Sequence, residues 1–175
     1  MLYPFTIWLT GLPSAGKTTI AFDLQNRFKL DGISAVVVDG DIFRKQFCSD
    51  LGFSLGDRHE NIRRAASMAR IVNDSGVIAI CSFISPTQEI RQLAKSIIGS
   101  ESFVEVFVST PLSVCKQRDS KGLYRKADLG EIKELTGISS PFETPNNPYY
   151  QVDTSTQSRD EVITSIYRAL QGKFL

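Results

Sequence analysis

The segment from Gly11 to Thr18 constrains this chain most, because its sequence GLPSAGKT fits the phosphate-loop pattern G-x-x-x-x-G-K-[ST]. Residues 5–10 before it are aromatic and β-branched and predict a buried strand, whereas residues 19–28 after it carry apolar side chains at helical spacing. Strand, loop and helix in this order predict backbone N–H groups and a helix start that bind phosphate. A chance glycine-rich turn is the alternative, and the flanking segments argue against it. We therefore expect the chain to bind a nucleoside triphosphate.

Two side chains of this loop can take part in phosphoryl transfer. Lys17 can reach the β- and γ-phosphates of ATP, and the Thr18 hydroxyl can ligate Mg²⁺. We expect the ATP contacts to come from Gly11, Leu12, Pro13, Ser14, Ala15, Gly16, Lys17, Thr18 and Thr19.

The rest of the chain alternates between short apolar runs and helical patterns. Residues 34–38, 77–81 and 103–108 predict strands of a parallel sheet, and residues 151–153 predict a final strand edge. Helices are expected at 111–118 and 159–170. This alternation predicts an α/β fold, a three-layer sandwich like that of the P-loop nucleoside-phosphate kinases, with a central parallel sheet and a basic lid. Ligands of such sheets bind at the carboxyl ends of the strands.

Two serines have the sequence context of helix N-caps. Ser54 is followed by Asp57 in the spacing of a capping box, which predicts a helix from about residue 58 to 74 that Gly76 ends. Ser85 precedes Pro86 and Gln88, and the same reasoning predicts Ser85 as the N-cap of the next helix. N-capping alone accounts for Ser85 at this level of reasoning.

Length and composition favour one soluble domain over residues 1–175. The net charge of +1 predicts no general attraction to nucleic acid or membranes, so the expected partner is a small nucleotide. No signal-peptide pattern or long apolar stretch is present, which favours a cytoplasmic location. Residues 119–149 differ from the rest, because basic side chains alternate there with glycines and prolines. We expect this segment to be a functional lid.

Two further groups of residues are candidates for chemistry. Asp39 and Asp41 follow a predicted strand and could hold Mg²⁺ or accept a proton, although an Asp-Gly turn is the alternative. Arg58, Asn61 and Arg64 recur every third residue and share one side of a helix. Arginine suits phosphate and sulfate oxygens, whereas a solvated charged face is the other interpretation.

With these segments identified, the chain resembles the adenylylsulfate (APS) kinases, which use ATP to phosphorylate the 3′-hydroxyl of adenosine 5′-phosphosulfate. The resemblance extends over nearly the whole chain. It rests on Trp8-Leu9-Thr10-Gly11-Leu12, Asp39-Gly40-Asp41 with Arg44, Asp50-Leu51-Gly52-Phe53-Ser54, Asp57-Arg58 with Asn61-Ile62-Arg63-Arg64, Ser82-Phe83-Ile84-Ser85-Pro86, Arg118-Asp119 with Lys121-Gly122-Leu123-Tyr124, Gly130-Glu131-Ile132-Lys133, and Thr136-Gly137-Ile138.

The resemblance implies a role for each matching position. Arg44, Arg58 and Asn61 are expected to hold the acceptor nucleotide, with Phe53 stacked on its adenine and Ser85 in the acceptor site. Arg118 is expected near the ATP base and Lys121 near the transferred phosphate, under the lid. The resulting catalytic set is Lys17, Asp39, Asp41, Ser85 and Lys121, and the acceptor set is Asp41, Arg44, Phe53, Arg58, Asn61, Ile84, Ser85, Lys121 and Leu135. A homodimer is also implied.

The sequence departs from the family pattern at one position that bears on the substrate. Leu135 stands where the family usually has a Phe that forms the second half of the adenine clamp. One alternative is therefore a 3′-kinase of the same scaffold for a different nucleotide, such as a cytidine diphosphoramidate. A second alternative is a non-catalytic nucleotide-binding subunit, against which the intact Lys17, Thr18, Asp39 and Asp41 argue.

Overall fold

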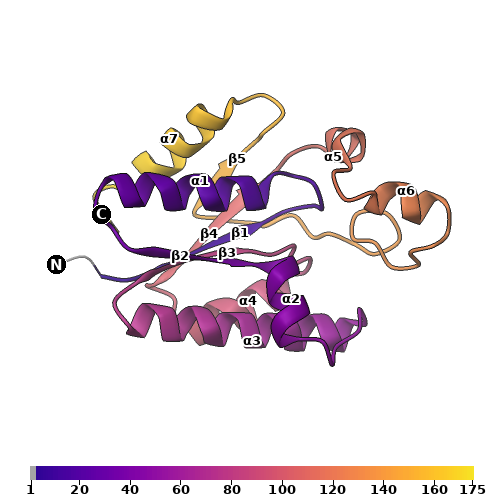
Figure 1. Ribbon diagram of the computed structural model, residues 1–175, viewed down its shortest axis with the longest axis horizontal. Coiled ribbons are helices and arrows are strands. Elements are labelled where there is room, and N and C mark those ends of the chain that lie inside the picture. Colours follow the sequence, from indigo (N-terminus) through magenta and orange to yellow (C-terminus); the bar gives the residue numbers. More distant parts are fainter. Residues whose placement is uncertain (1–2) are drawn as a thin grey trace.

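The computed structural model describes residues 3–175, which form a central sheet of five parallel strands with helices on both faces (Figure 1). The strands follow the order β2-β3-β1-β4-β5 across the sheet. Their bounds are β1 Thr6–Thr10, β2 Ala35–Asp39, β3 Ile78–Ser82, β4 Phe103–Val108 and β5 Tyr150–Val152. The predicted α/β sandwich with a parallel sheet is confirmed.

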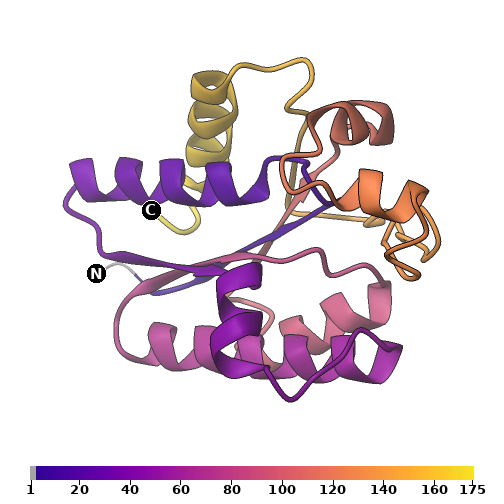
Figure 2. The same ribbon diagram turned by 45° about the vertical axis from the view of Figure 1, so that its right-hand side comes forward.

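The helices divide between the two faces of this sheet. Figures 1 and 2 show α1 and α7 on one face and α2, α3 and α4 on the other. The bounds are α1 Lys17–Leu30, α2 Gly40–Phe47, α3 Leu55–Asp74, α4 Gln88–Ile98, α5 Leu112–Arg118, α6 Leu123–Asp128 and α7 Arg159–Leu170. The helix α2 was not predicted, since its first residues form the Asp-Gly-Asp sequence that is typical of a turn.

Strand β1 lies at the centre of the sheet, and both of its faces are buried. Ile7 and Leu9 pack under α1 and α7, whereas Trp8 packs on the opposite face with Ala65 and Ala69 of α3. Apolar side chains on both faces are what a continuous apolar run in a parallel sheet requires. The phosphate loop therefore starts from a central strand whose five residues are all buried.

The two predicted N-caps have different outcomes. Ser54 does cap α3, where its hydroxyl accepts from Asp57 N, although the helix begins at Leu55 rather than near residue 58. The prediction for Ser85 is wrong. Thr87 is the N-cap of α4, with its hydroxyl accepting from Ile90 N, and Glu143 accepts from Gln88 N at 2.6 Å. The Ser85 hydroxyl accepts from the indole of Trp8 instead.

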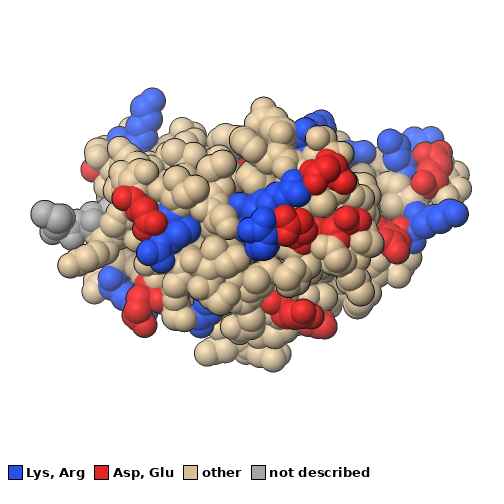
Figure 3. All heavy atoms as spheres, turned by 90° about the horizontal axis from the view of Figure 1, so that it is seen from below, with Lys and Arg blue, Asp and Glu red and all other residues tan. Residues whose placement is uncertain are grey.

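Charges on the α3 side of the molecule occur as neighbouring opposite pairs. Figure 3 shows this side with several blue and red groups side by side, and the α3 ion pairs include Arg63 with Glu60 and Arg70 with Asp74. Within residues 3–175, no helix is long and apolar enough to cross a membrane.

Candidate active site

The phosphate loop folds tightly between β1 and α1. Gly11 has φ +152°, and a Cβ there would lie 2.5 Å from the carbonyl oxygen of Val108. Only glycine therefore allows the phosphate loop to approach the end of β4 so closely. Lys17 turns back over the loop, and its ammonium group donates to the carbonyls of Gly11 at 2.9 Å and Leu12 at 2.7 Å. The loop is thus held in a curved form, and α1 begins at Lys17 within it, with Gly16 as the N-cap.

Lys17 is almost completely buried, and this changes its protonation. Burial lowers the pKa of Lys17 to about 7, because the ammonium form loses its hydration; Lys121 lowers the pKa further, whereas Asp39 opposes the shift. A polyphosphate in the loop would supply negative charge and favour the ammonium form. The buried lysine is therefore suited to an anionic ligand.

Asp39 ends β2 beside the phosphate loop. Its Oδ2 accepts a hydrogen bond of 2.7 Å from the Thr18 hydroxyl, and Oδ1 accepts from the backbone N–H groups of Asp41 and Ile42. Asp39 is therefore the N-cap of α2 as well as a neighbour of Thr18. Asp41, by contrast, is exposed and forms an ion pair with Lys121.

A cleft of about 1760 Å³ opens at the carboxyl ends of the strands, as predicted for such a sheet. It brings together most of the residues that the sequence singled out. These are Pro13, Ser14, Gly16, Lys17, Thr18, Thr19, Asp39, Asp41, Arg44, Phe53, Arg58, Asn61, Ile84, Ser85, Arg118, Lys121 and Leu135. Three loop residues do not line the cleft: Gly11 and Ala15 are buried, and Leu12 faces a separate hollow.

The half of the cleft beside α2 and α3 carries arginine and aromatic groups. The guanidinium of Arg44 lies over the ring of Phe53 at 4.7 Å, and Phe53 is 61% exposed. Arg58 donates to Phe53 O through Nε. Asn61 is buried at the wall, and within residues 3–175 its Oδ1 has no hydrogen-bond partner. This half therefore offers a flat ring, two cations and an unused acceptor.

Arg64 lies outside this cleft. It forms hydrogen bonds with both oxygens of Asp50 and with Glu60. For Arg64, the interpretation as part of a solvated charged face is therefore the correct one. Only Arg58 and Asn61 of the three line the cleft.

Residues 119–149 lie over the same end of the sheet and contact the site at several points (Figures 1 and 2). Arg58 Nη1 donates to Thr136 Oγ1 at 2.7 Å, Lys121 pairs with Asp41, and the Tyr124 hydroxyl donates to Pro13 O at 3.0 Å. Lys121, Lys126 and Lys133 line the cleft. Leu135 lines the cleft but also packs in the core, and it is only 6% exposed. Only a small part of its side chain is therefore available to a ligand.

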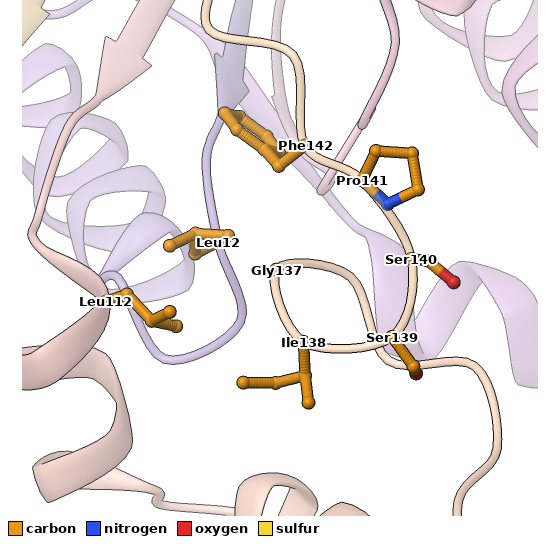
Figure 4. Close-up of a pocket in the computed structure, with 8 residues that line it drawn as sticks. All are labelled: Leu12, Leu112, Gly137, Ile138, Ser139, Ser140, Pro141 and Phe142. Carbon is orange, nitrogen blue, oxygen red and sulfur yellow. The ribbon is translucent and has the colours of Figure 1, made fainter.

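A smaller hollow lies where this segment meets the phosphate loop. Figure 4 shows Leu12, Leu112 and Phe142 around it, with Gly137 close to Leu12. A Cβ on Gly137 would lie 2.6 Å from Leu12 Cδ2. The segment therefore packs directly on the loop that carries Lys17.

Sequence reasoning missed one residue of the cleft that links two of its parts. Thr154 follows β5, accepts from Arg118 Nη1 at 2.6 Å, and lies within hydrogen-bond distance of Thr110 and of Ala15 O in the phosphate loop. Its place at the carboxyl end of a strand was the signal that could have found it.

Comparisons with known proteins agree with this arrangement. The family model described as adenylylsulphate kinase matches residues 3–153. The adenylyl-sulfate kinase of Phocaeicola vulgatus is 49% identical over 91% of this chain and 78% of its own length, and that of Thermodesulfovibrio yellowstonii is 45% identical over 97% and 84%. The structure of Mycobacterium tuberculosis APS kinase in complex with AMPPNP and APS matches with a TM-score of 0.93 and 39% identity, covering 98% of this chain and 100% of that one. The chain therefore belongs to the adenylyl-sulfate kinase family.

Proposed function

We propose that the protein transfers the γ-phosphoryl group of ATP to the 3′-hydroxyl of adenosine 5′-phosphosulfate and so forms 3′-phosphoadenosine 5′-phosphosulfate. The observation that carries this proposal is the continuous cleft, with the phosphate loop in one half and Arg44, Phe53, Arg58 and Asn61 in the other. The relative from Mycobacterium tuberculosis has been solved in complex with AMPPNP and APS, which supports the same pair of ligands here.

On the ATP side, Lys17 and the loop amides would bind the phosphates, and Arg118 would contact the base. The Thr18 hydroxyl and the Asp39 carboxylate are adjacent hard oxygen ligands, which fits Mg²⁺ held partly by phosphates. Bound there, Mg²⁺ would neutralise charge that develops on the phosphates. Lys121 would add a further positive charge near the transferred group.

On the acceptor side, Phe53 would stack on the base and the cations Arg44 and Arg58 would pair with the anionic groups. Asn61 lies at the buried wall, where its Oδ1 has no partner among residues 3–175, and this oxygen would accept from the nucleotide. Ile84 and Ser85 would complete the wall, with direct in-line transfer and no phosphorylated Ser85. Asp41 is the better candidate for the general base, because Lys121 contacts only its Oδ2, whereas both oxygens of Asp39 already accept hydrogen bonds.

The second candidate is a 3′-kinase for another nucleotide, and Leu135 favours it. An acceptor screen with purified protein, ATP and Mg²⁺ tests both, with APS and cytidine diphosphate derivatives as acceptors and Lys17→Ala as the inactive control. Phosphorylation of APS with a kcat/KM above that of the other acceptors supports the proposal. Preference for a cytidine acceptor would contradict it, and the absence of transfer to any nucleotide would favour a non-catalytic role.

The wider organisation is also proposed. We infer a single domain over residues 1–175 with a lid over about 119–149, in a cytoplasmic homodimer. The single five-stranded sheet supports the first of these. The APS kinase of Thiobacillus denitrificans is hexameric. Sedimentation of the purified protein tests the homodimer, and the mass of a hexamer would contradict it.

A further inference from the structure

We propose that Trp8 is a positioning residue for the acceptor site, because its indole N–H fixes the Ser85 hydroxyl in one orientation. Ser85 then directs its own proton into the cleft, toward an anionic oxygen of the acceptor nucleotide. This inference rests on the proposed function, since it assigns Ser85 to the acceptor half of the cleft.

The direction of the hydrogen bond between these residues is fixed by chemistry. Trp8 Nε1 lies 2.9 Å from Ser85 Oγ, and an indole nitrogen can only donate. Ser85 Oγ is therefore the acceptor, and its own proton remains available. Within residues 3–175, Ser85 Oγ donates to no protein acceptor. Because Ser85 lines the cleft, a ligand oxygen there would complete its hydrogen bonding.

Trp8 is held rigidly enough to orient its partner. Its side chain is fully buried on the central strand β1. The ring of Phe83 stacks on it with a centroid distance of 5.2 Å and an interplanar angle of 13°, and Phe103 packs against it at 5.9 Å. A large ring packed on two sides cannot rotate freely, so the N–H direction is constant.

The backbone of Ser85 is constrained as well. Its φ of +46° lies in the left-handed region, which a non-glycine residue adopts only when its surroundings hold it there. Arg91 Nη1 donates to Ser85 O at 2.8 Å, and Thr10 Oγ1 lies 3.4 Å from the same oxygen. Arg91 is itself buried, with only 2% of its surface exposed. Two elements therefore hold this serine at the wall of the cleft: β1 contacts its hydroxyl and its carbonyl through Trp8 and Thr10, and α4 contacts its carbonyl through Arg91.

The inference makes a specific claim about catalysis. Without the indole donor, the Ser85 hydroxyl can rotate between staggered positions and donate elsewhere, so an oriented donor is lost. Trp8 then acts only through Ser85. Its effect should appear in acceptor binding and not in ATP binding.

A double-mutant cycle tests this claim with ATP and APS as substrates. Trp8→Phe should raise the KM for APS about five- to tenfold, the effect of one lost hydrogen bond, and leave the KM for ATP within twofold. Ser85→Ala should have a similar effect, and the double variant should match Ser85→Ala within twofold. Ile98→Val is the matched control, because it removes one methyl group from the same buried cluster but keeps the indole and both rings that pack on it; it should lower thermal stability without changing the KM for APS.

Independent, multiplying effects of Trp8→Phe and Ser85→Ala would overturn the proposal, since Trp8 would then act through the core. A second measurement needs no substrate. Trp8 is the only tryptophan of the sequence, so its indole N–H gives a single NMR signal. Ser85→Ala should shift this signal upfield, and an unmoved signal would also overturn the proposal. If wild-type protein shows no turnover of APS, the proposed function fails, and the indole signal alone decides on Trp8.

Discussion

Thr18 and Asp39 are joined by a hydrogen bond of 2.7 Å between the Thr18 hydroxyl and Asp39 Oδ2. The other oxygen of Asp39 caps α2. Asp41, two residues later, is exposed and paired with Lys121 of the opposite segment. The two carboxylates therefore face different partners, which predicts different roles in the reaction.

We expect Asp39→Asn and Asp41→Asn each to reduce kcat by about 10²-fold or more, the scale of a lost general base or metal ligand. They should differ in their dependence on Mg²⁺. Asp39→Asn removes a charge beside Thr18 and should raise the Mg²⁺ concentration required for half-maximal rate. Asp41→Asn should leave this concentration unchanged and lower the rate at every concentration. Steady-state rates across a Mg²⁺ series separate the two.

The conservative change to Asn keeps an N-cap at position 39, so neither variant should unfold. Thermal unfolding of both proteins provides the control. Near-normal rates in both variants would show that Asp39 and Asp41 only stabilise the start of α2 and take no part in the reaction.

The buried Lys17 predicts a proton linked to ATP binding. Its pKa is about 7 without ligand, because burial disfavours the ammonium form, so at pH 8 most molecules carry a neutral amine. Phosphate oxygens raise the pKa again, and the site must take up a proton on binding. The affinity for ATP should therefore fall as pH rises above 7, by at most about tenfold per pH unit.

Titration calorimetry at pH 8 in two buffers with different ionisation enthalpies measures this proton directly. Uptake should approach one proton per ATP in the wild type. Lys17→Arg is the matched control, because arginine stays charged and should show no uptake at this position. Equal uptake in both proteins would assign the proton to another group.

The strands and the phosphate loop were predictable, because their signals are local. Residues 103–108 and 159–170 have the predicted bounds, since apolar runs and helical spacing are read within one segment. Ser85 shows the limit of such reasoning. Its sequence context is that of an N-cap, but its hydroxyl bonds to Trp8, 77 residues away. A contact of this kind depends on strand order, which local patterns do not contain.

The site shows the same division. The phosphate loop carries a local motif, whereas the contacts of Arg58 with Thr136 and of Lys121 with Asp41 join segments about 80 residues apart. The helix α2 was missed because its Asp-Gly-Asp start is compatible with a turn. The sequence does not show that Asp39, the N-cap of α2, also contacts Thr18 of the phosphate loop. Charge and residue type suggested these residues, and only the fold brings them together.

Gly137 tests the contact between the proposed lid and the phosphate loop. It has φ +87°, and a Cβ would lie 2.6 Å from Leu12 Cδ2. Figure 4 shows Gly137 on the side of the hollow that faces Leu12. Gly137→Ala should lower the free energy of unfolding by about 1–2 kcal/mol, because alanine is strained at positive φ. It should also raise the KM for ATP severalfold, since Leu12 must move and its carbonyl holds Lys17.

Gly130→Ala separates these two effects. Gly130 has φ +75° with nothing within 4 Å of the added carbon, so it carries the same backbone strain without the contact. Denaturant unfolding should show similar losses in the two variants. An increase in the KM for ATP of equal size in both would remove the Leu12 contact from the explanation.

The last prediction concerns Leu135 and the base of the acceptor. Stacking of a base on an aromatic ring contributes about 1–3 kcal/mol, and here Phe53 is the open ring while Leu135 is largely buried. If the acceptor is APS, Leu135→Phe should lower its KM by up to about tenfold, because the adenine gains a second ring. Leu135→Met is the matched control, since it has a similar volume and no ring.

The burial of Leu135 also predicts a cost. A larger side chain at a position with 6% exposure should reduce the free energy of unfolding by about 1–3 kcal/mol, so kinetics must be measured well below the unfolding temperature. If the pocket has instead been shaped for a smaller base, the added ring should crowd it. Leu135→Phe would then reduce kcat/KM for a cytidine acceptor while Leu135→Met would not. A tighter APS complex in Leu135→Phe, with wild-type turnover of APS already efficient, supports sulfate activation; weak turnover of APS by both proteins contradicts it.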